Sequence, residues 1–452
     1  MHPKVFLETA TELTRLALQF DQALDHLIST YFAENGRCGS RERASLSSVV
    51  YGVMRQKLFF EYLAQTGEGP MARRLAILSY AFGQQADALS AVVNTETDAS
   101  SNHTPFVWRD YLNAALSDTE QAWLSQSLAT DVKNLDIQYQ HNLPEWLVEI
   151  IQQQLGMDIS SDTFIGFMNS LHQNASLDLR VNTFKSKRPA VLNLLKEQGL
   201  EASLTPYSPW GLRLEQKRGL SQLPIFNQGL LEVQDEGSQL LALALDAKRG
   251  ETVVDFCAGG GGKTLALGAM MKNTGRLYAF DTSAHRLEGL KPRMARSGLN
   301  NIHTMVINDE KDARIQRMWG KVDRVLVDAP CTGLGTLRRN PALKWRVKPK
   351  SVEQMVQLQS AILRSAAQLL KPGGRLIYAT CSLLPQENEE VAQAFSQEFK
   401  QEFEALPMQT LLAKPVGELA HNLCTPNTGL YLRLWPHLHH TDGFFAASWT
   451  KK

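Results

Sequence analysis

From residue 240 onward, short apolar segments alternate with amphipathic ones. "ETVVDFC", "GRLYAFD", "IHTMVIND", "VDRVLVDAP" and "GGRLIYATC" have the composition of strands, whereas stretches such as "SAHRLEGLKPRMARSG" have helical periodicity. Repeated β-α units of this length predict a parallel, doubly wound sheet with helices on both faces. Ligands bind such sheets outside the carboxyl ends of the strands. We therefore expect functional residues directly after each strand.

The preceding residues predict two further regions. Leu46, Val49, Val50, Val53 and Met54 recur with helical spacing, which predicts an α-helical bundle at the N-terminus. Strand-like "LDLRVNTFK" and helix-like "RPAVLNLLKEQG" then predict a small α+β unit between about 157 and 235. The expected domains are a helical one over 1–140, an α+β extension over 141–240 and an α/β domain over 241–452.

Composition restricts the compartment and the partners. The chain has 452 residues and a formal net charge of only +1, so a nucleic acid would have to meet a local basic patch. Its five cysteines are widely spaced and form no CxxC pair, which argues against a disulfide framework and a structural metal site. The N-terminus lacks the apolar run of a signal peptide, and no stretch is long enough to span a membrane. We expect a cytoplasmic protein with no metal and no membrane partner.

The segment "VVDFCAGGGGKT", residues 253 to 264, contains four consecutive glycines. It is not a P-loop, because Cys257 stands where the first glycine is required, and it lacks the third glycine of a dinucleotide loop. Asp281 follows the second strand, 22 residues beyond Gly259, at the distance where a carboxylate binds ribose hydroxyls. A glycine turn and an acidic residue without either signature favour S-adenosylmethionine as the cofactor.

The later strands end in two acids and two thiols. Asp309 follows the third strand, Asp328 and Cys331 follow the fourth, and Cys381 follows the fifth. A thiolate that adds to carbon 6 of a pyrimidine makes carbon 5 nucleophilic enough to accept a methyl group, and a second group must then help to remove the carbon 5 proton. Such a thiol needs an electropositive surrounding, which Lys263 and the basic residues after Cys331 could supply.

That basic segment, "TLRRNPALKWRVKPK", places Trp345 among six cations with no acidic residue. Positive charge beside an aromatic ring is typical of grooves for single-stranded or splayed RNA. A mobile basic surface loop is the alternative. The six cations are Arg338, Arg339, Lys344, Arg346, Lys348 and Lys350.

The motifs "VDAPCTGLGTLRRNPALKW", "YATCSLLPQENEEV" and "DFCAGGGGKT" resemble those of the RNA (cytosine-5)-methyltransferases of the Sun/Nop2/NSUN family, most of all the bacterial 16S ribosomal RNA type with a NusB-like N-terminal domain. The resemblance implies that Cys381 is the nucleophile and that Cys331 takes part in product release. It places Asp328 and Lys263 beside the target base. The implied cofactor residues are Cys257, Ala258, Gly259, Gly260, Gly261, Gly262, Lys263, Asp281, Asp309 and Asp328.

The resemblance also implies an RNA substrate, with 16S ribosomal RNA favoured and transfer RNA left open, and we expect a monomer. Gly259 and Gly260 depart from the family, which has alanine and proline there. Losing the proline is expected to cost about 1 kcal/mol in ordering the loop, which bears on cofactor affinity and not on the chemistry. The expected RNA-binding residues are Arg180, Asn182 and Lys185 of the α+β extension and Arg338, Arg339, Lys344 and Trp345 of the basic segment.

Two other classes of function fit the sequence less well. A non-catalytic, RNA-binding ribosome-assembly factor would have no need to keep Cys331, Cys381, Asp328 and Lys263 together. A phosphate-cleaving P-loop enzyme is disfavoured by Cys257 and by the lack of a matching magnesium-binding pattern. The sequence therefore favours an S-adenosylmethionine-dependent RNA methyltransferase.

Overall fold

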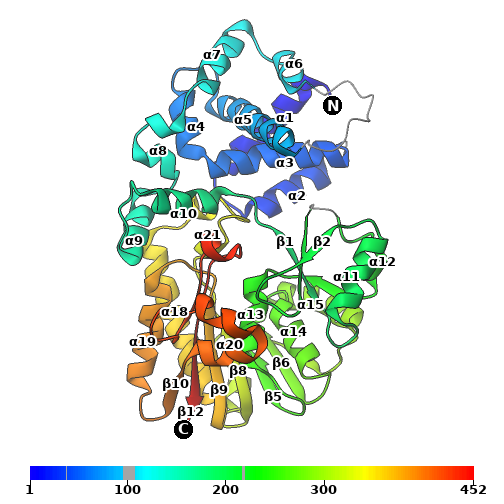
Figure 1. The fold of residues 1–452 in the computed structure, drawn as a ribbon, viewed down its shortest axis with the longest axis vertical. Helices are drawn as coiled ribbons and strands as arrows, with labels where there is room; N and C mark the ends of the chain where they lie inside the picture. Colours follow the sequence, from blue (N-terminus) through cyan, green and yellow to red (C-terminus); the bar gives the residue numbers. More distant parts are fainter. Residues whose placement is uncertain (37, 95–106, 216–218) are drawn as a thin grey trace. The chain divides into compact units, whose positions relative to one another are not determined.

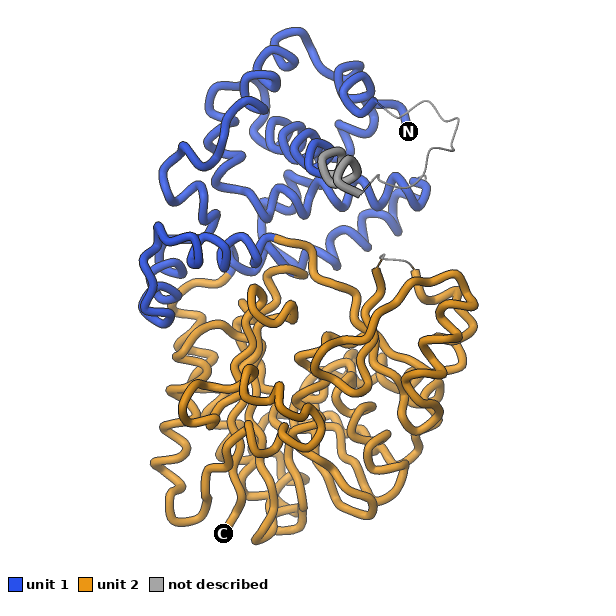
Figure 2. The backbone as a smooth tube through the Cα atoms, viewed as in Figure 1, with its two compact units in different colours: residues 1–172, 340–346 blue, residues 173–339, 347–452 orange. Residues whose placement is uncertain are grey.

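The computed structural model describes residues 1–36, 38–94, 107–215 and 219–452. The chain forms two compact units (Figures 1 and 2). Unit 1 comprises Met1–His172 together with Asn340–Arg346, and unit 2 comprises Gln173–Arg339 together with Val347–Lys452. The expected domain ranges, 1–140, 141–240 and 241–452, stay a prediction, because the two units follow packing and not position along the chain.

Unit 1 is helical, as the apolar periodicity predicts. The helix α3 (Ser40–Arg55) buries Leu46, Val49, Val50, Val53 and Met54 on one face. The short helix α17 (Leu343–Arg346) also belongs to this unit. None of the described helices is long and apolar enough to cross a membrane. The other helices are α1 (Pro3–Ala17), α2 (Leu24–Glu34), α4 (Lys57–Ala64), α5 (Met71–Asn94), α6 (Trp108–Asn113), α7 (Asp118–Leu128), α8 (Ile137–His141), α9 (Glu145–Leu155) and α10 (Asp162–His172), with a 3-10 turn η1 at Val132–Asn134.

Unit 2 contains a small antiparallel sheet with strand order β2-β3-β1-β4. Val191 and Leu195 of α11 (Arg188–Glu197) pack into its core, and α12 (Pro224–Asn227) precedes its last strand. This is the α+β unit that the alternation of strand-like and helix-like segments predicts. The strands are β1 (Leu177–Val181), β2 (Ala202–Leu204), β3 (Gly211–Leu214) and β4 (Leu231–Val233).

The large sheet of unit 2 has the order β10-β12-β9-β8-β5-β6-β7, with β11 paired to β12. The neighbours β9, β8, β5, β6 and β7 are parallel, as predicted. Beyond these five predicted strands, β12 extends the sheet and runs antiparallel to β9, β10 and β11; antiparallel strands at the side of a doubly wound sheet are common. The strands are β5 (Thr252–Asp255), β6 (Arg276–Asp281), β7 (Ile302–Val306), β8 (Val322–Asp328), β9 (Leu370–Thr380), β10 (Phe403–Leu406), β11 (Leu432–Leu434) and β12 (Phe444–Lys451).

Helices cover both faces of the large sheet (Figure 1). Neighbouring strand residues point to opposite faces, so Val253 packs into one core and Val254 into the other. The first core receives α13 (Glu236–Leu245), α14 (Gly262–Met270), α15 (Ala284–Ser297) and α20 (Met408–Val416). The second receives α16 (Ala313–Gln316), α18 (Pro349–Gln368) and α19 (Glu389–Glu398). The short α21 (Pro436–His439) precedes β12.

The order of the parallel strands reverses beside β5. The chain continues from β5 to β6 and β7 on one side, and then returns to β8 and β9 on the other. Ligands bind at such a reversal, outside the carboxyl ends of the strands. The loops that follow β5, β8 and β9 carry Cys257, Cys331 and Cys381, so the topology brings the predicted site residues to one edge of the sheet.

Candidate active site

A cavity of about 610 Å³ lies at the carboxyl ends of the parallel strands. Both Cys331 and Cys381 line it, and so do all the predicted cofactor residues except Gly261. Sequence reasoning did not identify Arg286 of α15 or Leu358 and Ile362 of α18, which also form its wall. The lining residues predicted for the cofactor are Cys257, Ala258, Gly259, Gly260, Gly262, Lys263, Asp281, Asp309 and Asp328.

The glycine loop makes a tight turn between β5 and α14. Gly261 caps α14 with a φ of 80°, and a Cβ there would lie 2.2 Å from Leu290 Cδ1. Gly259 also has a positive φ, 55°, and a Cβ at this residue would meet no protein atom within 4 Å. The loop therefore presents bare backbone to the cavity, where a ligand can approach it closely.

Asp281, the last residue of β6, is held in a fixed orientation. Its Oδ2 accepts from the Gly259 amide at 2.8 Å, and its Oδ1 accepts from the Ser283 amide at 2.7 Å. Asp309 is exposed in the loop after β7 and lines the cavity, whereas Asp312 lies away from it and pairs with Arg314. A carboxylate beside a glycine turn, with a second carboxylate on the next loop, fits an adenosine-type ligand such as S-adenosylmethionine.

The two predicted catalytic thiols lie together. Cys331 Sγ is 3.4 Å from Cys381 Sγ, and both residues are partly exposed to the cavity. The hydrogen bond with Cys381, together with burial, raises the pKa of Cys331 well above its ordinary value. Cys331 is therefore a protonated thiol at neutral pH, able to donate toward the sulfur of Cys381.

An ion pair stands in the same cavity. Lys263 Nζ is 2.6 Å from Asp328 Oδ2, and it lies 5.8 Å from the centre of the Phe444 ring. Burial lowers the pKa of Lys263, but the charge of Asp328 outweighs this effect, so the pKa is raised overall. Lys263 thus stays positively charged beside the two thiols.

Cys257 is a different kind of thiol. Burial raises its pKa well above the ordinary value, and the charges of Asp255, Asp328 and Asp281 add to the rise. Cys257 is therefore a neutral thiol at pH 7, and it lines the cavity as part of the glycine loop. Among the described residues, no group of three or more His, Cys, Asp or Glu side chains could hold a metal ion.

The α+β residues expected to bind RNA have protein partners in unit 2. Arg180 is buried and donates to Gln234 Oε1 at 2.6 Å, while Asn182 donates to the carbonyls of Gly229 and Ser297. Lys185 is exposed and donates to two carbonyls, at 2.8 and 2.7 Å. Direct RNA contacts by these residues stay a prediction, and in this conformation their side chains hold the small sheet in place.

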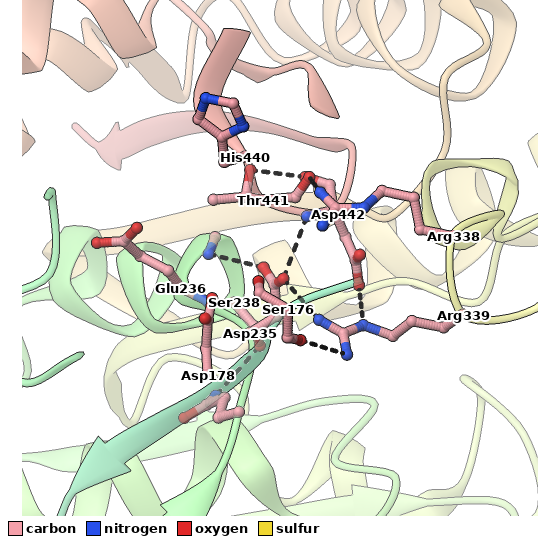
Figure 3. Close-up of polar contacts among 12 residues, drawn as sticks. Ser176, Asp178, Asp235, Glu236, Ser238, Arg338, Arg339, His440, Thr441 and Asp442 are labelled. Carbon is pink, nitrogen blue, oxygen red and sulfur yellow. Dashed lines mark hydrogen bonds and ion pairs between the residues drawn. The ribbon is translucent and has the colours of Figure 1, made fainter. Parts of the chain in front are cut away.

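Arg338 and Arg339 lie in a cluster of buried acids (Figure 3). Arg339 Nε is 2.6 Å from Asp442 Oδ2, and its Nη2 is 3.0 Å from Asp235 Oδ2. Arg338 donates to the Thr441 carbonyl at 3.0 Å. An RNA contact by either arginine, which stays a prediction, would compete with these bonds.

Lys344 and Trp345 are held inside unit 1. Lys344 is buried and its Nζ donates to the carbonyls of Arg55 and Asn142, each at 2.7 Å. Trp345 Nε1 donates to the Met54 carbonyl at 2.8 Å. Burial lowers the pKa of Lys344 well below its ordinary value. The expected RNA contacts of this pair also stay a prediction, with both polar groups already occupied.

The doubly wound sheet, the glycine loop and the acids after β6 and β7 define an S-adenosylmethionine-dependent methyltransferase. The family model described as 16S rRNA methyltransferase RsmB/F matches residues 242–450, and the model of the RsmF/B-like ferredoxin-like domain matches 143–221. The chain is 33% identical to the probable ribosomal RNA small subunit methyltransferase B of Synechocystis, over 91% of each chain. It is 28% identical to the protein of the same name from Bacillus subtilis, over 97% of each chain.

Among solved structures, a methyltransferase homolog protein from Pyrococcus horikoshii is 28% identical, with a TM-score of 0.58, over 72% of this chain and all of that one. The chain belongs to the RsmB/F family of 16S ribosomal RNA methyltransferases. The resemblance and the fold class expected from the sequence are thereby confirmed. The substrate is RNA, and S-adenosylmethionine is the methyl donor.

Proposed function

We propose that this protein methylates carbon 5 of a cytosine in RNA through a covalent bond between Cys381 and carbon 6. The observation that carries the proposal is the 3.4 Å separation of Cys331 Sγ and Cys381 Sγ in the cavity that also holds the Lys263–Asp328 pair. A methyltransferase that acts on a nitrogen or an oxygen has no need of a thiol pair, because those atoms are nucleophilic already.

In this proposal Cys381 adds as a thiolate, and its electron pair forms the sulfur–carbon 6 bond. The carbon 5–carbon 6 double bond opens, so that carbon 5 becomes nucleophilic. S-adenosylmethionine, when bound, would supply the methyl group to carbon 5 and leave as S-adenosylhomocysteine. A base then removes the carbon 5 proton, the double bond re-forms, and the sulfur–carbon bond breaks to return the Cys381 thiolate.

Cys331, Lys263 and Asp328 assist the thiol of Cys381. Cys331 keeps its proton at neutral pH, so it is able to donate toward the Cys381 sulfur, 3.4 Å away, and we assign it to release of the product. Lys263 places a positive charge beside the thiols and the reacting base, and Asp328 keeps that charge in position. Preorganised charge of this kind stabilises charge that develops during the reaction.

The cofactor is assigned to the bare backbone of the glycine loop together with Asp281, Asp309 and Asp328. The substrate is proposed to be 16S ribosomal RNA, acted on in the cytoplasm by a monomer. Methylation of transfer RNA and a non-catalytic role in ribosome assembly are the alternatives, and the experiment below separates them.

Cys381→Ala is expected to abolish transfer of labelled methyl groups to RNA while cofactor binding persists, because the loop and the acids are untouched. Cys331→Ala is expected to accumulate a denaturant-resistant protein–RNA adduct, because release is impaired. Cys38→Ala is the control, since Cys38 lies in unit 1.

Bisulfite sequencing of ribosomal and transfer RNA, from cells with and without the protein, identifies the cytosine. Activity retained in Cys381→Ala would refute the assignment.

A further inference from the structure

A buried carboxylate joins the loops that carry the two thiols. Glu387 ends the 3-10 turn η3 (Pro385–Glu387) and has no exposed surface. Its Oε1 accepts from the Thr332 amide at 2.8 Å, and its Oε2 accepts from the hydroxyls of Thr332, at 2.6 Å, and of Ser382. Thr332 directly follows Cys331, and Ser382 directly follows Cys381. One side chain thus bonds to the immediate neighbours of both thiols.

Glu387 is itself held from two further directions. Gln359 of α18 donates to Glu387 Oε1 at 3.0 Å and to the Pro330 carbonyl at 2.9 Å. The Tyr378 hydroxyl donates to the Glu387 carbonyl at 2.6 Å. The side chain therefore cannot shift without breaking bonds to α18 and to both loops.

The chemistry of this network calls for a carboxylate. An ionised carboxylate only accepts hydrogen bonds, and a backbone amide only donates, so the Thr332 amide and the hydroxyls are matched to it. A buried charge is weak support for stability, because an apolar side chain of similar volume often stabilises a core as well. Yet Glu387 is not among the residues that line the cavity, so it acts on the reaction indirectly, through the two loops that carry the thiols.

We propose that Glu387 is a positioning residue: its carboxylate holds the Cys331 and Cys381 loops in register, so that the two sulfurs meet in the cavity. The inference rests on the proposed roles of the two thiols. The charge of Glu387 has a second effect, because it adds to the hydrogen bond and burial that raise the pKa of Cys331. The same side chain thereby sets the geometry of the thiol pair and favours the protonated form of Cys331.

Glu387→Gln keeps the volume but turns at least one amide hydrogen toward existing donors. We expect kcat for RNA methylation to fall about 10- to 100-fold, because small misplacements of reacting groups have effects of this size. KM for RNA should stay within about twofold, since no substrate contact is removed. Glu390→Gln is the matched control, because Glu390 is exposed on the same segment. Thermal unfolding and cofactor binding verify that each variant is folded.

Thr332→Val removes one hydroxyl donor and leaves the charge in place, so it keeps the test informative if Glu387→Gln unfolds. Thr332→Val should also lower kcat for RNA methylation. The kcat of the double variant, Glu387→Gln with Thr332→Val, should be within about twofold of that of Glu387→Gln alone, because both substitutions act through one hydrogen-bond network. Full activity of Glu387→Gln, or additive losses in the double variant, would overturn the proposal.

Alkylation of the thiols by iodoacetamide tests the positioning role of Glu387 independently of methylation. In Glu387→Gln, the pH of half-reaction of Cys331 should fall relative to the wild type, because the neighbouring negative charge that helps to raise the pKa of Cys331 is removed. Glu390→Gln should show no such shift. If the pH dependence of Cys331 alkylation is the same in Glu387→Gln as in the wild type, the positioning role of Glu387 is contradicted. If Glu387→Gln shifts the alkylation of Cys331 as expected but the wild-type protein methylates no cytosine, the proposed function fails while the positioning role of Glu387 stands.

Discussion

At the scale of single residues, Arg339 shows how distant partners decide what a side chain does. It stands between two carboxylates from other parts of the chain, Asp235 at 8% and Asp442 at 4% side-chain exposure (Figure 3). Burial, followed by the charge of Asp235, raises the pKa of Asp442 to about 7, although Arg339 works against the rise. The positive charge of Arg339 thus offsets part of the energetic cost of burying Asp235 and Asp442 together.

Arg339→Met is therefore expected to lower the free energy of unfolding by about 3–5 kcal/mol, because it leaves buried charge unpaired. The raised pKa of Asp442 means that the folded state holds a proton that the unfolded state loses above about pH 4, so stability falls as pH rises toward about 7. Without Arg339 the pKa of Asp442 rises further, and the fall extends to higher pH.

Urea unfolding at about pH 5 and about pH 8 measures this difference, which should be larger at the higher pH. Arg346→Met is the control, because Arg346 is exposed. Equal stabilities of wild type and Arg339→Met would show that the cluster does not depend on the arginine.

At the scale of elements, the turn from β5 to α14 requires glycine at a defined place. Gly261 has a φ of 80° and lies against Leu290. Gly259 has a φ of 55°, a value that other residues adopt with strain. The departure from the family's alanine thus falls at a residue where glycine relieves strain, even though it adds flexibility to the unliganded loop.

Gly261→Ala is expected to raise the Kd for S-adenosylmethionine at least about tenfold. The new Cβ would collide with Leu290, and alanine would have to adopt the left-handed backbone conformation of Gly261. Gly260→Ala is the matched change next to it: its Cβ would meet only Arg293 Nη1, at 3.4 Å. That variant should alter Kd by less than about threefold. Isothermal titration calorimetry compares the two, and equal affinities would contradict the conformational argument.

At the scale of the whole molecule, the fold divides a basic run that is continuous in the sequence. Arg338 and Arg339 join the acid cluster of unit 2, whereas Lys344 and Trp345 are held within unit 1. The remaining cations, Arg346, Lys348 and Lys350, are exposed. Among the cations of this run, the exposed ones are best placed to meet RNA phosphates.

Replacing both Lys348 and Lys350 with Gln is expected to reduce the slope of log affinity against log salt by about 0.7 for each RNA phosphate that a lysine no longer neutralises. Trp345→Phe should leave the slope unchanged but lower the free energy of unfolding by about 1 kcal/mol, because the hydrogen bond to the Met54 carbonyl is removed. Filter binding at several salt concentrations, with urea unfolding, tests both. A lower RNA affinity of Trp345→Phe at every salt concentration would support its predicted contact with RNA.

Predictions from the sequence succeeded where the determining forces are local. The apolar strands and amphipathic helices of unit 2 follow from hydrophobic periodicity, and parallel strands bring their carboxyl ends to one edge. Asp281, Asp328, Cys331 and Cys381 could therefore be brought together from their place after each strand. The pairing of β12 with β9 was not predicted, because it joins residues that are more than 60 positions apart in the sequence.

By itself the sequence determined the class of protein, the arrangement of its catalytic domain and the set of residues at the strand ends, because each depends on spacing along the chain. Only the tertiary structure decided which cations are free to meet RNA and that Glu387 bonds to the neighbours of both thiols. The physical reason is that burial and hydrogen bonding depend on partners that the fold brings together. Thr332 and Glu387 are 55 residues apart and share two hydrogen bonds.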